Sequence, residues 1–340
     1  MHRAVPILLV AILLTPGCGR GGTSESTSPN QTVSAARPAS PSPRASGTIC
    51  PTAARPGPRK FMVFVYMPDR QEAVLFGGSD ATNKSVKDTW VWKAGCWSQP
   101  SPAQSPPERD FAAGAYDAVN HQVLLYGGRG GGQFYSDTWA WNGLTWTQVA
   151  SSGPPTLFPA AVAGFDPVTR RVLLFGAAGA GGGAQTWTWN GDKWLQLSPA
   201  RTPEGRDASS LALDPTRGQL MLFGGMSFTR GGLNDTWTWD GSNWNELTPA
   251  ATPPLRFRAT IGSWVAGHVA ILLGGVGGPG TGGDAWKWDG TNWSQIASPG
   301  VRSDAAAIDV GPRVLFFGGD GPTGTYNDVE SWDGTSWSIN

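Results

Sequence analysis

A run of four apolar residues followed by a glycine pair recurs six times along the chain. The runs read AVLF, VLLY, VLLF, LMLF, AILL and VLFF. The pairs that follow them are Gly77-Gly78, Gly127-Gly128, Gly176-Ala177, Gly224-Gly225, Gly274-Gly275 and Gly318-Gly319. Successive pairs are 50, 49, 48, 50 and 44 residues apart. A nearly constant period of this length indicates one array of repeated units rather than two ordinary domains.

Each repeat has the pattern of four short strands. The first begins near an Arg, as in RDFAAGAY of the second copy, and the second is the apolar run. The third reads DTWVW in the first copy, where both tryptophans share one face because side chains alternate along a strand. Another Trp opens the fourth strand after a turn such as Asn142-Gly143. Seventeen of the 18 tryptophans fall in this frame.

Six such sheets, each burying its Trp and aliphatic faces against its neighbours, predict an all-β, six-bladed β-propeller of four-stranded antiparallel blades. The first strands contain AAGA, AAVAG, ASSLA and AAAI, small residues that suit strands crowded near a central axis. All six blades are complete in sequence order. Closure is therefore expected to rest on packing between blades six and one, where Glu330 replaces the first Trp of the pair.

The glycine pair followed by paired aromatic positions resembles the Kelch repeat over residues 59–340, although both aromatic positions here are mostly Trp. The central domain of galactose oxidase has the same type of propeller, so the resemblance raises the question of a copper enzyme. That family needs two His and two Tyr at one metal. Here His121 and His268 lie in blades two and five, three blades apart. We therefore expect no metal and no cofactor.

The N-terminus has the pattern of an export signal. Residues 1–17 contain Arg3 and an apolar run too short for a membrane span, and LLTPGC resembles a bacterial lipoprotein signal. We predict that Cys18 is lipidated, that 18–57 is a disordered Ser, Pro and Gly-rich tether, and that 58–340 forms the propeller. The expected location is the cell envelope, with the lipid as the only membrane contact. Ordinary secretion is the alternative.

Two cysteines remain after Cys18. In an exported protein Cys50 and Cys96 are expected to form a disulfide that ties the end of the tether to the fourth strand of blade one. The alternative is two free, buried thiols.

Five repeats carry an Arg at the start of the innermost strand, near the mouth of the channel. They are Arg59, Arg109, Arg206, Arg256 and Arg302. In some Kelch domains arginines at this position bind acidic peptides, so the resemblance implies a cationic ring for an anionic ligand. The alternative is a repeated ion pair with the aspartates that head the third strands, Asp88, Asp137, Asp235, Asp284 and Asp328. Blade three lacks both members, having Phe158 and Gln185.

The loops between the second and third strands differ from blade to blade and lie on the same face as these arginines. Variable loops on a rigid scaffold are the usual place for recognition. Our candidate ligand-binding residues in them are Arg129, Phe134, Tyr135, Phe228, Arg230 and Tyr326. Aromatic side chains there could stack on sugars or could pin their own loops.

The charge of the chain excludes one class of partner. It has 25 Lys and Arg, 25 Asp and Glu, and no basic cluster, so nucleic-acid binding is not expected. No catalytic motif is present. We predict a monomeric module that binds a protein or glycan outside the cytoplasmic membrane. The alternative is a carbohydrate-active enzyme, a hydrolase or an enzyme like the sialate epimerases, using Glu108 and Glu204 at the channel mouth.

Overall fold

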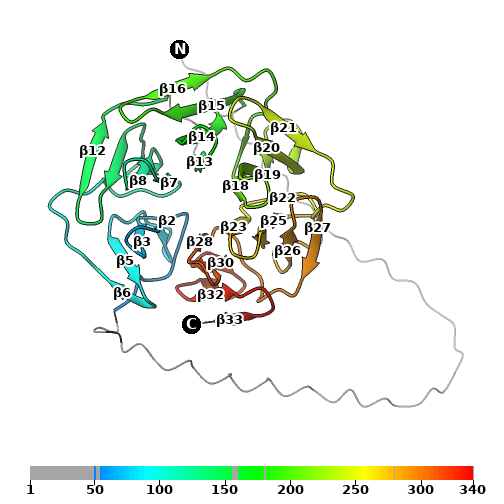
Figure 1. Cartoon of the computed structure of the whole chain (residues 1–340). Coiled ribbons are helices and arrows are strands. Elements are labelled where there is room, and N and C mark those ends of the chain that lie inside the picture. Colours follow the sequence, from blue (N-terminus) through cyan, green and yellow to red (C-terminus); the bar gives the residue numbers. More distant parts are fainter. Residues whose placement is uncertain (1–49, 51–53, 155–159, 180, 279, 340) are drawn as a thin grey trace, which may run out of the picture. The chain divides into compact units, whose positions relative to one another are not determined.

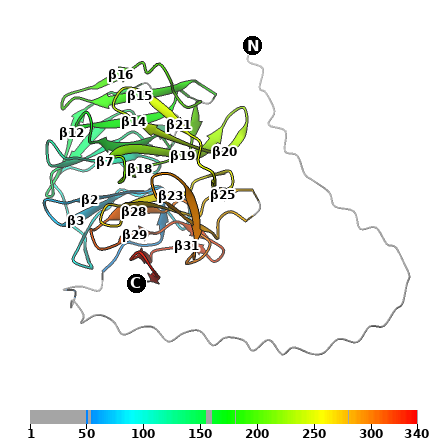
Figure 2. The same cartoon turned by 45° about the vertical axis from the view of Figure 1, so that its right-hand side comes forward.

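The computed structural model describes residues 50, 54–154, 160–179, 181–278 and 280–339. The predicted signal peptide 1–17, Cys18, most of the tether 18–57 and Phe158 lie outside these residues. Six antiparallel sheets surround a common axis, with β2, β7, β13, β18, β23 and β28 innermost (Figures 1 and 2). The predicted six-bladed β-propeller is confirmed. No helix in the described part of the chain is long and apolar enough to cross a membrane.

Each blade takes its four main strands from one repeat, in order from the axis outward. Blade one has β2 (Val63–Met67), β3 (Glu72–Phe76), β5 (Thr89–Lys93) and β6 (Cys96–Ser98). Blade two has β7 (Ala113–Asp117), β8 (Gln122–Tyr126), β11 (Thr138–Trp141) and β12 (Trp146–Ala150). Blade three has β13 (Val162–Asp166), β14 (Arg171–Ala177), β15 (Ala184–Trp189) and β16 (Trp194–Leu197).

The second half of the ring follows the same plan. Blade four has β18 (Ser210–Asp214), β19 (Gln219–Ser227), β20 (Gly231–Trp239) and β21 (Trp244–Leu247). Blade five has β23 (Thr260–Trp264), β24 (Val269–Leu273), β26 (Ala285–Trp288) and β27 (Trp293–Ile296). Blade six has β28 (Ala306–Asp309), β29 (Val314–Phe317), β32 (Val329–Trp332) and β33 (Trp337–Ile339).

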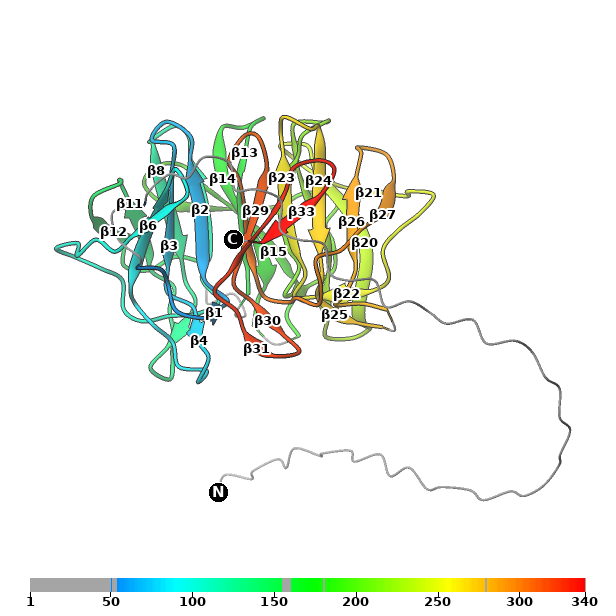
Figure 3. The same ribbon diagram turned by 90° about the horizontal axis from the view of Figure 1, so that it is seen from below.

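Two-residue strands extend the blades where the second strands end and the third begin. They are β1 (Arg59–Lys60), β4 (Ser79–Asp80), β9 (Arg129–Gly130), β10 (Gln133–Phe134), β17 (Arg206–Asp207), β22 (Arg256–Phe257), β25 (Val276–Gly277), β30 (Asp320–Gly321) and β31 (Gly324–Thr325). Figure 3 shows β1, β4, β22, β25, β30 and β31 along one edge of the ring. We call this side the loop face.

The hydrophobic core lies between blades rather than within them. In the cluster between blades one and two, Phe76 contacts Trp146 edge-on at a ring-centroid distance of 5.2 Å, and Trp146 also packs on Trp141. The fourth-strand Trp donates its indole N–H to a third-strand Thr of the preceding blade. These bonds, at 2.9–3.0 Å, join Trp146 to Thr89, Trp194 to Thr138, Trp244 to Thr186 and Trp293 to Thr236. The repeated Trp therefore holds adjacent blades together.

The glycine pairs are required by a close approach of neighbouring blades. Gly77 has a φ of 64°, and a Cβ there would lie 2.5 Å from the carbonyl oxygen of Arg109 in blade two. Left-handed backbone without a Cβ is the conformation that glycine provides. In blade three, where the pair is Gly176-Ala177, β14 continues through both residues and pairs with β15 in unbroken register, whereas β19 of blade four passes its glycine pair with a register shift. The sequence departure thus coincides with a change of backbone path.

Blades six and one close the ring by packing, as the sequence predicted. No strand is exchanged between their two sheets, and β28 lies beside β2. Phe64 and Phe317 pack in the cluster that joins these blades. The amide of Gly319 donates to the carbonyl of Arg59 at 2.8 Å. Glu330 does not lie at this seam. It pairs in register with Phe316, and Phe316 and Trp332 on the same face pack against Leu273 of blade five, so the expectation that Glu330 marks the contact of blades six and one is wrong. Glu330 is buried and accepts a hydrogen bond from Arg302 at 2.7 Å.

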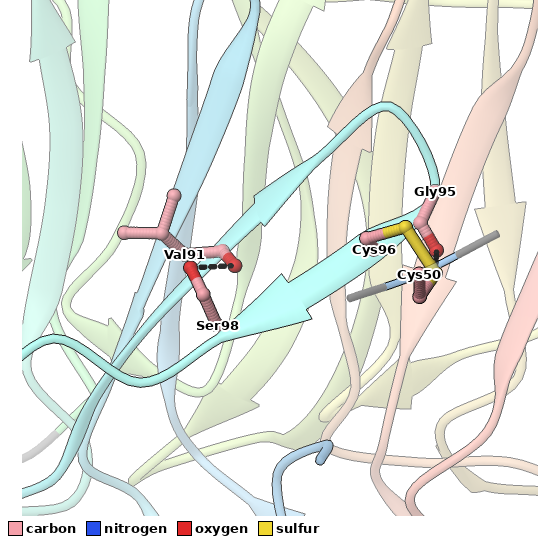
Figure 4. Close-up of a disulfide and its surroundings, with 5 residues drawn as sticks. All are labelled: Cys50, Val91, Gly95, Cys96 and Ser98. Carbon is pink, nitrogen blue, oxygen red and sulfur yellow. Dashed lines mark hydrogen bonds between the residues drawn. A yellow bond between two sulfur atoms is a disulfide. The ribbon is translucent and has the colours of Figure 1, made fainter. Parts of the chain in front are cut away.

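A disulfide joins Cys50 to Cys96 at the edge of blade one (Figure 4). The two Cα atoms are 5.3 Å apart, a separation that a disulfide spans readily. The bond fastens the segment that precedes β1 to the outermost strand β6.

Candidate functional site

The repeated arginines belong to the scaffold. Arg109 is 1% exposed, and its guanidinium forms two hydrogen bonds with Asp137, at 2.7 and 3.1 Å. It also donates to the carbonyl of Gly127 at 2.9 Å. Asp137 also accepts a hydrogen bond from the indole N–H of Trp139, at 2.7 Å. Arg, Asp, Trp and the glycine pair of one repeat therefore form a single hydrogen-bonded unit.

The same ion pair occurs in every blade that carries both residues. The pairs are Arg59 with Asp88, Arg109 with Asp137, Arg206 with Asp235, Arg256 with Asp284, and Arg302 with Asp328. All five arginines are buried. Burial by itself raises the pKa of Asp235, but hydrogen bonds and charge from Arg206 lower it below its usual value. The prediction that these arginines form an open cationic ring is therefore wrong, because each guanidinium is buried and paired with an aspartate of its own blade.

Blade three keeps only a neutral version of this unit. Gln185 stands where the other blades have Asp and accepts the indole N–H of Trp187 at 3.0 Å. Phe158, which replaces the Arg, lies outside the described residues. The loss of the cation is matched by loss of the anion, so no unpaired charge is created.

Two of the predicted loop aromatics cover these buried arginines. The ring centroid of Tyr135 lies 4.1 Å from the guanidinium carbon of Arg109, and that of Tyr326 lies 4.8 Å from that of Arg302. Cation–π contacts of this kind fix the ring in place. Tyr135 and Tyr326 therefore cover buried arginines of the scaffold, which corrects their assignment as ligand-binding residues.

The remaining loop candidates are accessible to different degrees. Phe134 is 58% exposed at the tip formed by β9 and β10, and Phe228 is also exposed. Arg230 forms an ion pair with Glu204, which also accepts a hydrogen bond from Ser227. Glu204 is thus occupied within its own loop, and nothing in the described residues brings it together with Glu108.

A ring of residues that the sequence analysis did not single out surrounds the channel mouth on the loop face. Two positions after each repeated Arg, or after its replacement in blade three, the backbone adopts a positive φ. The six residues are Phe61, Phe111, Ala160, Ala208, Arg258 and Asp304, with φ between 49° and 86°. We call them the mouth ring. None is glycine, so each position carries local backbone strain.

Backbone hydrogen bonds hold the mouth ring in this conformation. The amide of Phe111 donates to the carbonyl of Phe61 at 3.0 Å, and Phe61 donates to Asp304 at 3.2 Å. Asp304 donates to Arg258 at 3.0 Å, and Arg258 to Ala208 at 2.8 Å. These bonds link blades two, one, six, five and four in succession. Strained residues held by the surrounding structure are typical of binding sites and active sites.

The chemistry of the mouth ring is concentrated on blades five, six, one and two. Phe61 and Phe111 stack with their centroids 3.8 Å apart, and both are half-buried. The guanidinium of Arg258 lies 5.3 Å from the centroid of Phe61, and that of Arg129 lies 4.7 Å from the centroid of Phe111. Blades three and four contribute two alanines instead. One side of the mouth therefore carries an aromatic pair with a cation at each end, and the other side carries neither.

Carboxylates complete this half of the mouth. Asp304 is 7% exposed and lies 3.8 Å from Arg258. Burial raises its pKa to about 6, an effect that Arg258 only partly offsets. Asp320 forms an ion pair with Lys60 at 2.5 Å, and although burial raises its pKa, Lys60 and Thr325 bring it below the usual value. Two neighbouring carboxyl groups thus have opposite pKa shifts.

Two further aspartates lie at the start of the innermost strands. Asp110 is buried and accepts hydrogen bonds from Ser85 and Arg129, at 3.2 and 2.9 Å, and from Ser79. One carboxylate oxygen of Asp207 is buried without a hydrogen-bond partner among the described residues. Burial raises the pKa of Asp207, against the nearby charge of Arg258.

A cavity of about 180 Å³ lies along the axis directly behind the mouth ring. It is lined by residues at the start of the innermost strands, among them Met62, Ser210, Ala259, Thr260 and Ala305. Ser210 and Thr260 donate their hydroxyl groups to carbonyls of the next blade, at 2.6 and 2.9 Å. Most of the lining residues are apolar, whereas most of the surface accessible inside the cavity is polar.

Comparison with known proteins adds no family to this description. Neither a scan against protein-family models nor a search of the curated proteins gives a match. Among the described residues, no group of three or more His, Cys, Asp and Glu side chains is arranged to hold a metal ion. The candidate site therefore depends on the geometry of the mouth itself.

One signal in the sequence could have located the mouth ring. When the six copies are aligned on the repeated Arg, the position two residues later reads Phe, Phe, Ala, Ala, Arg and Asp. This position varies between the copies, as the loops do, while the scaffold positions around it repeat. It has no motif of its own and lies within the predicted first strand rather than in a variable loop.

Proposed function

We propose that the protein is an exported Kelch-type propeller that acts as a binding module, held at the cell envelope by a lipid on Cys18. Its ligand, a glycan outside the cytoplasmic membrane, binds at the mouth ring on the loop face. The observation that carries this proposal is the division of each repeat. Residues shared by the copies are buried in the scaffold, whereas those that differ gather at one mouth.

The side chains of the mouth favour a sugar over a simple anion. A half-buried aromatic pair offers a flat surface for the C–H face of a sugar ring, as rings at binding sites commonly do. Arg258 and Arg129 beside it are donors, and the carboxylate of Asp320, whose side chain is 32% exposed, is an acceptor. Hydroxyl groups both donate and accept, so one sugar can use all three. The mixed charges disfavour a purely anionic ligand.

A substitution that preserves the backbone tests this site. Phe111→Asn removes the stacked ring while keeping a residue type that tolerates left-handed backbone. We expect the propeller to remain folded and its binding on a glycan array to fall about tenfold or more, since an aromatic contact contributes about 1 kcal/mol beyond its buried area. Ala208→Asn, at the equivalent position of blade four, is the matched control.

The comparison has two decisive outcomes. Loss of glycan binding in Phe111→Asn with retention in Ala208→Asn supports the mouth ring. Equal binding by both variants, or capture of an envelope protein but no glycan by the wild type, contradicts it. Capture of an envelope protein without glycan binding would instead indicate a protein-binding surface formed by the exposed apolar residues on the rim, Phe134, Leu255, Val276 and Val301.

One observation favours a second candidate function, a carbohydrate-active enzyme. Asp304, with a pKa of about 6, has the property of a general acid, and Asp320, with its lowered pKa, that of a base or nucleophile. These residues replace Glu108 and Glu204 as the carboxylates to test. Hydrolysis of chromogenic glycosides that is lost in Asp304→Asn would establish this function, and its absence with tight binding would favour the module.

Asp304 also predicts how stability depends on pH. Its pKa is higher in the folded protein than in the unfolded chain, so the folded state binds the extra proton between about pH 4 and pH 6. The free energy of unfolding contributed by this group therefore decreases as the pH rises through about 6. At pH 7 the free energy of unfolding of Asp304→Asn, measured by urea denaturation, should exceed that of the wild type by roughly 2–3 kcal/mol. The difference should disappear near pH 4.

Asp320→Asn provides the control of opposite sign. Its pKa is lowered in the folded state, so its charged form stabilises the protein at neutral pH and that contribution disappears in acid. Urea denaturation of both variants from about pH 4 to pH 8 measures the two slopes. A wild type and an Asp304→Asn variant with parallel pH profiles would contradict the assignment.

A further inference from the structure

Adjacent blades also meet on the face opposite the mouth, where the first hairpin turn of one blade contacts the second hairpin turn of the next. Between blades four and five this contact is filled by Arg217. Its guanidinium donates to Asp214 at 2.8 Å and to the carbonyl of Gly290, and lies 5.6 Å from the ring centroid of Trp288. The indole N–H of Trp288 also donates to Asp214, at 3.0 Å. A carboxylate, a carbonyl and an indole ring thus surround one guanidinium.

Between blades three and four the same three groups are present without the guanidinium. Asp166, Gly241 and Trp239 occupy the positions of Asp214, Gly290 and Trp288, and Trp239 donates to Asp166 at 3.1 Å. Thr169 stands where blade four has Arg217, and its hydroxyl donates to Asp166 at 2.7 Å. Among the described residues, the other oxygen of Asp166 accepts only the amide of Val168, at 3.0 Å, and can accept a further donor. These groups line a partly enclosed cavity of about 150 Å³. The space is several times the volume of one water, about 30 Å³.

Larger side chains pack on the corresponding turn at two other interfaces. A Cβ on Gly143 would lie 2.3 Å from the guanidinium carbon of Arg70, so Arg70 covers the turn of blade two. Trp264 packs in the same way on Gly334 of blade six. At blades three and four Val168 packs on the turn at Gly241, where a Cβ would lie 2.8 Å from its Cγ1. Thr169 does not reach as far as Arg217 does in blade four, and the cavity lies beside it.

We propose that this cavity is a binding site for the guanidinium group of an arginine side chain or of free arginine. The buried carboxylate of Asp166 and the carbonyl of Gly241 supply acceptors, and the ring of Trp239 supplies a face for stacking. A planar guanidinium with several donors matches this arrangement better than a compact ammonium group. The proposal is independent of the mouth ring.

One lining residue opposes the ligand. Arg171 also borders the cavity, and its positive charge reduces the affinity for a cation. Blade four has Gln219 at the equivalent position, beside the site that Arg217 fills. Arg171→Gln is therefore expected to strengthen binding.

Titration of the mature protein with methylguanidinium chloride, at concentrations far below those that denature, tests the site. Calorimetry measures affinity, and the indole N–H resonance of Trp239, assigned with Trp239→Phe, reports the location. Methylammonium chloride at equal ionic strength is the control ion. The peptides Gly-Arg-Gly and Gly-Lys-Gly, together with free arginine, distinguish an arginine side chain in a chain from the free amino acid.

Thr169→Arg is the decisive variant, since it supplies the missing guanidinium from the chain itself. It should raise the melting temperature and weaken methylguanidinium binding at least about tenfold. Thr169→Val, which leaves the cavity open, should still bind. Arg217→Thr should gain a second site and recover stability when methylguanidinium is added. Unchanged binding in Thr169→Arg, or equal binding of methylammonium by the wild type, would overturn the proposal.

Discussion

Replacing Arg109 with Ala is expected to destabilise the propeller by about 3–5 kcal/mol, the cost of removing one partner from a buried ion pair. The substitution leaves the carboxylate of Asp137 buried with only the N–H of Trp139 from the original unit. It also removes the donor to the carbonyl of Gly127. Urea denaturation followed by Trp fluorescence measures the change. The same reasoning applies to Arg256, which is equally buried.

Arg129→Ala is the matched control within the same blade. Its side chain is 49% exposed, and the buried Asp110 would keep its hydrogen bonds from Ser79 and Ser85, so a smaller loss than for Arg109→Ala is expected. Arg109→Phe combined with Asp137→Gln reproduces the residues of blade three and should cost less than Arg109→Ala alone, because no unpaired charge remains. If Arg109→Ala kept full stability and lost only ligand binding, the scaffold role would be refuted.

Loss of the disulfide is expected to reduce the free energy of unfolding by up to about 4 kcal/mol. Cys50 and Cys96 are separated by 46 residues, and closing a loop of that length restricts the unfolded chain by about this amount in the chain-entropy model. The loop includes β1 to β5, so the effect acts on all of blade one. Denaturation midpoints with and without reductant, with intact mass to verify the bond, measure it.

Cys50→Ser and Cys96→Ser should behave alike, and neither should respond to reductant. A wild type with the same midpoint in both redox states would show that the bond does not constrain unfolding. A bond of this kind persists in oxidising compartments. It therefore supports the proposal of export, which otherwise depends on residues 1–18.

The paired design of the scaffold could be inferred from the repeat because paired residues vary together. Gln185 and Phe158 replace Asp and Arg in the same copy, as an ion pair requires. The glycine pairs and tryptophans recur because every blade makes the same contacts with the next. What the alignment could not decide was whether the arginines faced the channel. Their orientation depends on hydrogen bonds to the third-strand aspartates, which lie 26–29 residues later in the sequence.

The loop aromatics illustrate the same difficulty. Tyr135 and Phe134 are neighbours in one variable loop, and both were expected to contact ligand. Along a strand, adjacent side chains point in opposite directions. Tyr135 covers Arg109, whereas Phe134 is exposed. Nothing local to the loop distinguishes them, because the deciding contact comes from the start of the blade.

The glycine-pair repeat by itself determined the fold, the number of blades, the strand order and the manner of closure, since these follow from local patterns repeated six times. The mouth required the tertiary structure. Phe61, Phe111, Arg258 and Asp304 come from four different copies, and each is unremarkable in its own repeat. Only closure of the ring brings the first blade beside the sixth. The stacked pair of Phe61 and Phe111 comes from consecutive blades, but only ring closure brings Arg258 and Asp304 beside Phe61 to complete the candidate site.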